Sequence, residues 1–291
     1  MFKTDSEIKM TPEEFVLFRD TIYSHCGIYF SDDMKYLLEK RLSRRLSSLN
    51  LSSYNDYYYH LKYGRNTDQE MMDIMDILTT NETYFFREAY QLKAFTDEIL
   101  PEIINRKKAM GSNSIRIWSA GCSTGEEPYT IAMLLREMDE LRGWNIEIVG
   151  TDISQRVLHV ARQGVYGRLS FRATDDAYIK RYFREQGDGF RINDDVRELV
   201  SISHLNLFES GRIVLLGRMD VVFCRNVIIY FDTPAKKKVV ESFYNTLQDG
   251  GFLLLGHSES LMNITTLFTL RHFKNDMIYQ KPERSLSGWS L

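Results

Sequence analysis

The stretch Ile115-Arg-Ile-Trp-Ser-Ala-Gly-Cys-Ser-Thr-Gly-Glu-Glu-Pro-Tyr129 decides the fold. Its first residues alternate as in a short β-strand, the small residues that follow predict a tight turn, and the acidic residues before Pro128 predict the start of a helix. A strand, a glycine turn and a helix in this order are typical of α/β proteins that bind an adenosine-type ligand at the carboxyl end of a strand.

The two acids of this stretch restrict the ligand. A helix N-terminus attracts anions through its free N–H groups and its dipole. Glu126 and Glu127 satisfy that end of the helix internally and would repel a phosphate. We therefore expect a nucleoside that lacks phosphates and carries positive charge. S-adenosylmethionine, with its sulfonium and ammonium groups, fits this description.

Composition sets the broad class. The chain has 291 residues, of which 43% are hydrophobic and 26% charged, as in a soluble globular protein, and its net charge of -3 gives no bias toward nucleic acid or an anionic membrane. The three cysteines Cys26, Cys122 and Cys224 lack ligand-like spacing, so we expect reduced thiols, no disulfide and no metal site. The polar N-terminus does not resemble a signal peptide, and no apolar run approaches the roughly 20 residues that span a bilayer. These features predict a cytoplasmic protein that is not inserted in a membrane.

Residues 1–78 form a predicted N-terminal all-helical domain. Thr11 followed by Pro12 and two glutamates is a helix start, and a second helix begins after Ser31. Two further helices begin near Ser53 and Asp68. The apolar stripe of the second helix is Leu38, Leu42, Leu46 and Leu49. Residues 79–113 are expected to be a linking segment and a helix that contribute to the ligand site.

From residue 114 to 284 strands and helices alternate, which predicts an α/β domain with a doubly wound, largely parallel sheet. A closing hairpin at Phe268–Lys281 would add an antiparallel edge, a small β insertion is expected at about residues 178–203, and residues 285–291 are predicted to be a frayed tail. The predicted strands are Ile115–Ser119, Ile146–Thr151, Asp220–Cys224 and Gly250–Gly256, and the predicted helices are Tyr129–Leu141, one from Ser154, and Pro234–Leu247.

Asp152 ends the second of these strands. An acid at this position accepts hydrogen bonds from ribose hydroxyls in nucleoside-binding α/β folds, and the alternative is a cap on the helix that begins beside Ser154. The glycine turn is the weaker signal, because Ser123 stands between Gly121 and Gly125 where the usual pattern has a third glycine.

Three segments, Thr80–Arg87, Trp118–Tyr129 and Phe223–Phe231, together resemble the CheR-type chemoreceptor glutamate methyltransferases. The resemblance runs from about Thr11 to Pro282. It implies a Rossmann-like class I methyltransferase domain joined to the helical domain. It also implies methyl transfer from S-adenosylmethionine to glutamates on the cytoplasmic helices of chemoreceptors, with S-adenosylhomocysteine as the product.

The resemblance also assigns site residues. Arg87 and Tyr230 would orient the cofactor and the substrate carboxylate, without proton transfer. The cofactor-binding residues that it implies are Asn81, Thr83, Arg87, Glu127, Asp152, Asn206, Leu207, Arg225 and Asn226. The residues alone would favour a strand-end cap for Arg225 and Asn226 and a buried core ring for Tyr230.

A basic run on the second helix is the candidate substrate surface. Its residues are Lys40, Arg41, Arg44 and Arg45, beside the leucine stripe. Such a run is usually a solvated face, and nucleic acid could use the same patch. In the family this face meets glutamate-rich receptor helices, so the resemblance implies the cytoplasmic domain of a methyl-accepting chemoreceptor as partner, and no nucleic acid.

The insertion and two alternative functions complete the sequence hypotheses. Arg184–Asn193 is short for the version that grips a receptor tail by strand addition, so we expect no dependence on a tail peptide; binding of a receptor-tail pentapeptide at low micromolar affinity would contradict this.

The alternative functions are a non-catalytic S-adenosylmethionine-binding signalling module and a methyltransferase for another acceptor, such as RNA or a small molecule. We expect the protein to act as a monomer.

Overall fold

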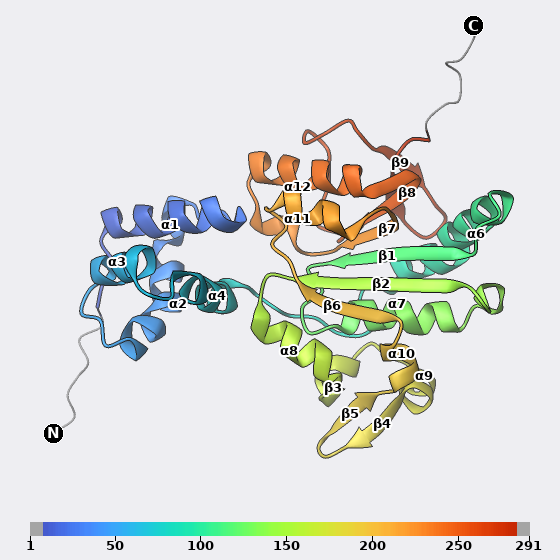
Figure 1. Cartoon of the computed structure of the whole chain (residues 1–291), viewed down its shortest axis with the longest axis horizontal. Coiled ribbons are helices and arrows are strands. Elements are labelled where there is room, and N and C mark those ends of the chain that lie inside the picture. The colour runs from blue at the N-terminus through green and yellow to red at the C-terminus, as the bar shows by residue number, and fades with distance from the viewer. Residues whose placement is uncertain (1–7, 284–291) are drawn as a thin grey trace, which may run out of the picture. The chain divides into compact units, whose positions relative to one another are not determined.

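The computed structural model describes residues 8–283 and divides the chain into two compact units (Figure 1). The first unit holds the chain up to Thr80 together with Tyr230–Ala235, and the second holds Asn81–Ile229 and the chain from Lys236 onward. The predicted tail at 285–291 and the first seven residues, on which the expectation about a signal peptide rests, lie outside the described residues. Within residues 8–283, no helix is both long and apolar enough to cross a membrane.

The first unit is built from helices. They are α1 (Pro12–Cys26), the 3₁₀ turn η1 (Asp32–Met34), α2 (Lys35–Ser48), α3 (Tyr54–Tyr63) and α4 (Thr67–Leu78). The predicted start of α1 is a capping box: the Thr11 hydroxyl accepts from Glu14 N–H, and the Glu14 carboxylate accepts from Thr11 N–H at 2.8 Å. Gly27 ends this helix with a φ of 76°, in the left-handed region that favours glycine.

Apolar side chains from all four helices form the core of this unit. Leu38, Leu42 and Leu46 of α2 are buried, as the stripe predicts, whereas Leu49 at the end of the helix is half-buried. Phe18 of α1 packs edge-on against Tyr54 of α3, with ring centroids 6.2 Å apart. The segment that returns to this unit is tied to it by an antiparallel bridge between Ile28 and Phe231.

The second unit is organised around a seven-stranded sheet with the order β6-β2-β1-β7-β8-β10-β9 (Figure 1). The first five strands pair in parallel, and β10 is antiparallel to both β8 and β9, so the expected hairpin edge is present. Its strands are β1 (Ser114–Ala120), β2 (Asn145–Asp152), β6 (Val200–His204), β7 (Met219–Cys224), β8 (Leu247–Leu255), β9 (Thr269–His272) and β10 (Met277–Gln280). The predicted doubly wound α/β class is confirmed.

Helices connect these strands and pack on them. The helices are α5 (Ala89–Ala94), α6 (Leu100–Ala109), α7 (Glu126–Arg136), α8 (Gln155–Gln163), α9 (Asp176–Tyr182), α10 (Asp194–Arg197), α11 (Ser210–Ile213) and α12 (Thr233–Thr246). The shorter turns are η2 (Phe95–Ile99), a π-helical segment joining α5 to α6, and the 3₁₀ turns η3 (Asp139–Leu141), η4 (Arg168–Phe171), η5 (Val214–Leu216) and η6 (Ile228–Tyr230). The helix predicted after β1 therefore ends at Arg136, with a separate turn before β2.

Alternate residues of the central strands supply the core of the second unit. Ile117 of β1, Phe223 of β7 and Leu254 of β8 belong to one buried apolar cluster with Phe95 and Ile131 from the helical segments. The Phe95 ring meets the Phe223 ring edge-on at 5.1 Å between centroids. The long segment between residues 79 and 113 thus packs on the sheet through its apolar side.

The insertion is a three-stranded antiparallel sheet, β3-β5-β4, formed by β3 (Val165–Tyr166), β4 (Phe183–Gln186) and β5 (Gly189–Ile192). It corrects the expected extent of about 178–203 at both ends. β3 lies before that range, and Val200–His204 is the edge strand β6 of the main sheet, paired in parallel with β2. Because an edge strand is partly open to water, its alternating Val-Ser-Ile-Ser-His sequence resembles a surface hairpin.

Candidate functional site

The order of the strands locates the candidate site. The chain leaves β1 for β2 on one side and later reaches β7 on the other side, so the topology switches direction between β1 and β7. Ligands of open α/β sheets bind outside the carboxyl ends of the strands at such a switch point. The predicted residues Glu127, Asp152, Arg225 and Asn226 lie at the carboxyl ends of β1, β2 and β7 or in the segments that follow them, at this edge.

The loop after β1 is tightly held. The N–H groups of Gly121 and Cys122 both donate to the carbonyl of Thr151 at the end of β2, at 2.8 and 2.9 Å. Gly121 has a φ of 79°, and a Cβ there would lie 2.4 Å from Cγ2 of Val227, in the segment after β7. Glycine is therefore required where the loops after β1 and β7 pass each other.

Asp152 joins this loop to the next helix. Its Oδ2 accepts from Ser123 N–H and its Oδ1 accepts from Ser154 N–H, both at 2.9 Å. The residue is buried, and burial raises the pKa of its carboxyl, while these backbone hydrogen bonds oppose the rise. The cap beside Ser154 is thus present, and the same carboxylate also fixes the loop after β1.

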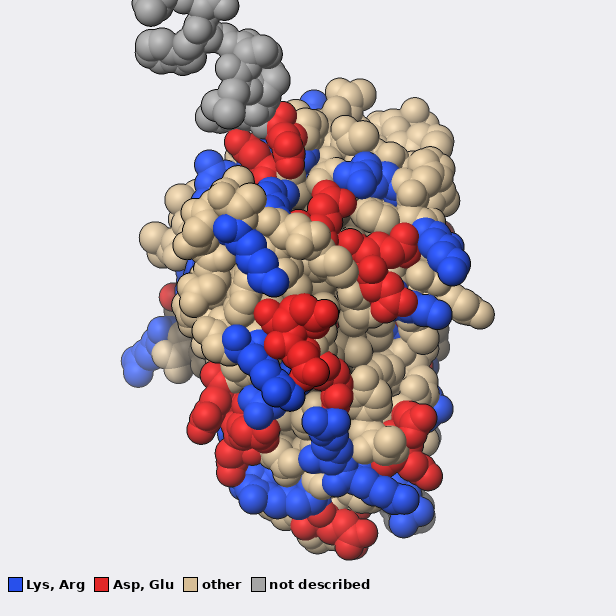
Figure 2. Space-filling view, turned by 90° about the vertical axis from the view of Figure 1, so that its right-hand side faces the viewer, with Lys and Arg blue, Asp and Glu red and all other residues tan. Residues whose placement is uncertain are grey.

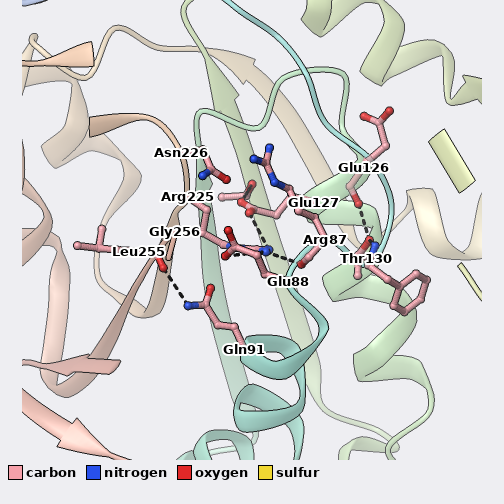
Figure 3. Close-up of polar contacts among 12 residues, drawn as sticks. Arg87, Glu88, Gln91, Glu126, Glu127, Thr130, Arg225, Asn226, Leu255 and Gly256 are labelled. Atoms are coloured by element: carbon pink, nitrogen blue, oxygen red, sulfur yellow. Dashed lines mark hydrogen bonds and ion pairs between the residues drawn. The ribbon is translucent and has the colours of Figure 1, made fainter. Parts of the chain in front are cut away.

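Arg225, directly after β7, is the centre of a buried ionic cluster (Figure 3). Its Nη1 lies 3.3 Å from Oε2 of Glu127, its Nε donates to Oε2 of Glu88 at 3.2 Å, and its Nη2 donates to the carbonyl of Arg87. The Arg225 side chain is 4% exposed, that of Glu88 11% and that of Glu127 14%. One guanidinium therefore holds two carboxylates from segments far apart in the sequence.

The two acids at the start of α7 have different surroundings. Glu127 accepts from the Ser119 hydroxyl at 2.6 Å, and Glu126 accepts from Thr124 at 2.6 Å and from Ser170 at 3.0 Å. Burial raises the pKa of both carboxyls. Arg225 and Ser119 oppose this rise for Glu127, and the hydroxyls of Thr124 and Ser170 oppose it for Glu126. Glu126 is satisfied by its own neighbours, whereas Glu127 faces Arg225.

Backbone strain is concentrated around this cluster. Four non-glycine residues of its segments have positive φ: Phe86 at 60°, Glu88 at 58°, Ser123 at 49° and Asn226 at 60°. Left-handed backbone is unfavourable for residues with a Cβ and persists where the surrounding structure holds it, commonly at functional sites. Ser123 thus takes a conformation that the missing third glycine would adopt freely.

The segment before α5 meets the loop after β1. The Asn81 carbonyl accepts from the Ser123 hydroxyl at 3.1 Å, and Thr83 is half-buried. Arg87 donates from Nη1 to the Glu82 carbonyl at 3.0 Å and lies over the Tyr84 ring. The structure therefore brings the backbone of this segment to the site, while the Arg87 side chain contacts its own segment.

The segment after β6 reaches the same edge. Leu205 N–H donates to the Asp152 carbonyl at 3.0 Å, which places the next two residues close to the end of β2. Asn206 and Leu207 are both buried. The Asn206 amide accepts from Phe208 N–H at 3.0 Å and donates to Glu209 at 3.3 Å, so it stabilises its own turn.

The free polar groups of the site suit a cation. Oδ1 of Asn226 is buried and lacks a hydrogen-bond partner within the described part of the chain. No lysine or arginine among residues 8–283 forms an ion pair with Asp152. Carboxylates and an amide oxygen are acceptors, so they fit an ammonium, a sulfonium and ribose hydroxyls better than a phosphate.

The cysteines and the metal-ligating side chains were the other candidates for chemistry. No cluster of three or more metal-ligating side chains occurs among the described residues. All three cysteines are buried, and burial raises the pKa of the Cys122 thiol well above its ordinary value. A thiol of raised pKa is a poor nucleophile at neutral pH.

Sequence reasoning missed three residues of this edge. Glu88 directly follows the motif residue Arg87, and Ser119 is the polar side chain in an otherwise apolar strand end. Glu259, after β8, accepts backbone N–H groups from the segment after β7. A polar residue beside a motif, or at the end of a buried strand, was the available signal for the first two.

The remaining predicted residues belong to the first unit. The Tyr230 side chain is 38% exposed, and its carbonyl accepts from Tyr29 N–H at 2.9 Å. On α2, Lys40 and Arg44 are exposed, while Arg41 and Arg45 are half-buried. Arg41 donates to the Leu78 carbonyl, and Arg45 binds Glu70 and Asp73. Of the four expected basic residues, Lys40 and Arg44 are therefore the ones that α2 exposes to solvent.

Comparison with protein families covers both units. The model described as "CheR methyltransferase, all-alpha domain" matches residues 13–79, and "CheR methyltransferase, SAM binding domain" matches residues 81–276. Two matches in this order span most of the chain and correspond to its helical and α/β parts.

Curated relatives agree over nearly their whole length. "Chemotaxis protein methyltransferase 2" of Vibrio cholerae serotype O1 is 37% identical over 284 residues, covering 97% of both chains. "Chemotaxis protein methyltransferase 1" of Pseudomonas aeruginosa is 34% identical, covering 92% of this chain and 97% of the relative. "Chemotaxis protein methyltransferase" of Borreliella burgdorferi is 35% identical, covering 89% and 92%. The family resemblance read from the three motifs is confirmed.

Proposed function

The chain belongs to the CheR methyltransferase family, whose members bind S-adenosylmethionine and act in chemotaxis, and on that premise we propose a specific reaction. The protein transfers the methyl group to glutamate side-chain carboxylates on the cytoplasmic helices of methyl-accepting chemoreceptors. The products are glutamate methyl esters and S-adenosylhomocysteine, and the reaction takes place in the cytoplasm.

One observation supports the proposal most strongly: two carboxylates share Arg225 at the switch point of the sheet, beside the buried Oδ1 of Asn226, which lacks a hydrogen-bond partner within the described residues. Glu127 and Arg87 would hold the amino acid end of S-adenosylmethionine, with Asn81 and Thr83 beside them. Asp152 would accept from the ribose hydroxyls. The remaining contacts, around the adenine and the mouth of the site, would come from Asn206, Leu207, Arg225 and Asn226.

The protein's own contribution is orientation and the exclusion of water. When bound, S-adenosylmethionine supplies an electrophilic methyl group on a sulfonium. A substrate glutamate is ionised at pH 7, so no general base is required. We assign Tyr230 and Arg87 to orienting the substrate carboxylate and the cofactor. Alignment of the reacting groups and removal of water from the carboxylate then lower the barrier.

The substrate surface on α2 is proposed to be Lys40 and Arg44, with Arg41 and Arg45 as supporting residues. The first two are exposed, and the other two are held by groups of the first unit. Exposed cations can steer and align an acidic receptor helix, and their effect weakens as salt screens the charges.

Nucleic acid is the less favoured acceptor. The face of the molecule drawn in Figure 2 carries basic and acidic side chains interspersed, without one large basic patch. An RNA methyltransferase would more readily present basic and stacking aromatic side chains near its site. A non-catalytic module that binds the cofactor remains the other alternative, and the following experiment separates all three.

The test is transfer of labelled methyl from S-adenosylmethionine to acidic cytoplasmic fragments of chemoreceptors, with Glu→Ala variants of the acceptor sites as controls. The proposal expects base-labile label on wild-type fragments and none on the site variants. Label that resists base, or that appears on RNA instead, would assign another acceptor. Calorimetric binding of S-adenosylhomocysteine without any transfer would favour the non-catalytic module.

A further inference from the structure

A single carboxylate holds the segment that follows β7. Oε2 of Glu259 accepts from Asn226 N–H at 2.7 Å and from Gly256 N–H at 2.8 Å. Its Oε1 accepts from Val227 N–H at 2.9 Å and from Ile229 N–H at 3.2 Å. Three of these donors belong to one stretch of the chain, directly after Arg225.

The backbone N–H groups of this stretch lack the partners that a strand of the sheet would give them. It follows the last residue of β7, Cys224, so its N–H groups are beyond the ladder of the sheet. Asn226 also has a φ of 60°, which residues with a Cβ rarely adopt. Hydrogen bonds from backbone N–H groups to an ionised carboxylate are stronger than those to neutral acceptors, so Glu259 supplies the restraint that the sheet does not.

The neighbouring backbones show how close the fit is. A Cβ on Gly256 would lie 2.8 Å from Nδ2 of Asn226 and 3.0 Å from Oε2 of Glu259. On the other side, Cγ2 of Val227 lies 2.4 Å from where a Cβ on Gly121 would be, in the loop after β1. A movement of residues 226–229 would therefore disturb the loop that Asp152 holds, and with it the position of Arg225.

We propose that Glu259 is a positioning residue of the methyltransferase: its carboxylate fixes residues 226–229, and through them the Arg225 guanidinium. The proposal deepens the proposed function and rests on it for the role of Arg225. Glu259 itself does not touch cofactor or substrate in this scheme.

The experiment compares Glu259→Gln with Glu98→Gln. Glu98 is a matched control, because it also binds a loop: it accepts from Lys274 N–H at 2.8 Å and from the Asn275 side-chain amide at 3.0 Å, on the β9–β10 hairpin. The glutamine in Glu259→Gln keeps one acceptor oxygen and turns an NH₂ toward backbone donors, so it must lose part of the set. Glu259→Asp keeps the charge with a shorter reach and serves as the second variant if Glu259→Gln folds poorly.

Two readouts decide the outcome. Hydrogen exchange of the peptide spanning residues 225–231 should accelerate roughly tenfold in Glu259→Gln and stay at the wild-type rate in Glu98→Gln. At a temperature where each variant is folded, kcat for methyl transfer should fall roughly tenfold in Glu259→Gln only, with partial recovery in Glu259→Asp.

Unchanged exchange in residues 225–231, or losses of kcat no larger than in Glu98→Gln, would overturn the proposal and leave Glu259 a purely structural residue. Failure of the proposed function is visible separately. If wild-type protein methylates no receptor fragment, hydrogen exchange and the affinity for S-adenosylhomocysteine still report whether Glu259 positions the site. Faster exchange with weaker binding in Glu259→Gln supports the positioning role. No change in either contradicts that role.

Discussion

Glu70 in the first unit and Glu127 in the second are both largely buried and both lie beside an arginine, yet their pKa values move in opposite directions. Burial alone would raise the pKa of Glu70, but the Arg45 guanidinium and the Tyr57 hydroxyl outweigh it and lower that pKa. Burial raises the pKa of Glu127, because Arg225 and Ser119 offset only part of it.

The difference lies in how completely each carboxylate is satisfied. Arg45 donates from Nε to Glu70 at 2.9 Å and from Nη2 at 2.6 Å, and the Tyr57 hydroxyl adds a third bond at 2.6 Å. Arg225 instead reaches Glu127 through a single contact, from Nη1 to Oε2 at 3.3 Å, and turns its Nε to Glu88. A fully paired buried acid stabilises its fold, whereas an incompletely neutralised one is available to a cationic ligand.

The largest effect should come from Glu70→Ala. Removing Glu70 from this buried, bidentate ion pair leaves the Tyr57 hydroxyl without its acceptor and Arg45 with Asp73 as its remaining partner, and we expect a loss of about 3 kcal/mol in the free energy of unfolding of the first unit. Urea unfolding followed by circular dichroism measures it, with affinity for S-adenosylhomocysteine as the control that should hold within about twofold. A loss below about 1 kcal/mol would mean that the Glu70 pair is no more structural than a surface pair.

Glu127→Gln should show the opposite pattern. The amide still accepts from Ser119 but loses the charge that would attract an ammonium, so we expect affinity for S-adenosylhomocysteine to fall by about 2 kcal/mol, or roughly 30-fold. The free energy of unfolding should change by less than about 1 kcal/mol, since an incompletely neutralised acid is removed. Calorimetry and urea unfolding on the same preparation measure both. Equal losses of stability in Glu127→Gln and Glu70→Ala would end the contrast between the two regions.

The same contrast explains how far the sequence could lead. The glycine turn and Asp152 could be read from the sequence because each stands at the end of a strand, where local pattern and spacing carry the information, whereas Arg225 was assigned through the family resemblance alone. Glu88 adjoins a motif residue, but its pairing with Arg225, like the contact of Glu259 with Asn226, arises only when the order of strands brings distant segments together.

Long-range packing also separates residues that look alike in the sequence. Arg44 and Arg45 are neighbours on α2, but only Arg45 meets Glu70 and Asp73 of α4. β6 was assigned to the insertion because an edge strand alternates polar and apolar residues like a surface hairpin, and its pairing with β2 is not encoded locally.

Tyr230→Phe should affect rate alone. Tyr230 is a partly exposed phenol and belongs to neither cluster of buried charges. Loss of its hydroxyl would remove an orienting hydrogen bond to the substrate carboxylate, so we expect kcat to fall roughly tenfold with affinity for S-adenosylhomocysteine nearly unchanged. Steady-state methyl transfer and calorimetry test this. Parallel losses of turnover and cofactor affinity would contradict an orienting role.

Affinity for the cofactor product should depend on pH through Glu127. Only the ionised carboxylate attracts an ammonium, so affinity is highest above the raised pKa and falls as pH drops through it, starting above the ordinary value of 4.5. Glu70, whose pKa is lowered, stays ionised there, and its stabilisation is lost only as pH falls below 4.5 through the lowered pKa. Calorimetry from about pH 8 down to the lowest pH at which the protein stays folded should show affinity declining toward the acid end in the wild type and a flatter profile in Glu127→Gln. The same slope in both would point to Asp152, whose pKa is also raised.

The smallest effect is expected for Arg44→Gln, the exposed neighbour of the paired Arg45. Arg44 is exposed and forms no ion pair with the residues that the structure describes, so its removal should leave the free energy of unfolding within about 0.5 kcal/mol. If it helps to align an acidic receptor helix, KM for receptor fragments should rise roughly threefold at low salt, with kcat unchanged, because a single exposed charge contributes modestly. The difference from wild type should vanish near 0.5 M salt, where exposed charges are screened over a few ångströms.

Arg45→Gln is the internal comparison: it should destabilise the first unit by leaving the buried Glu70 without its cation. A salt-independent rise in KM, or a stability loss in Arg44→Gln equal to that of Arg45→Gln, would show that the two arginines share a structural role and that α2 presents no free basic surface at this position.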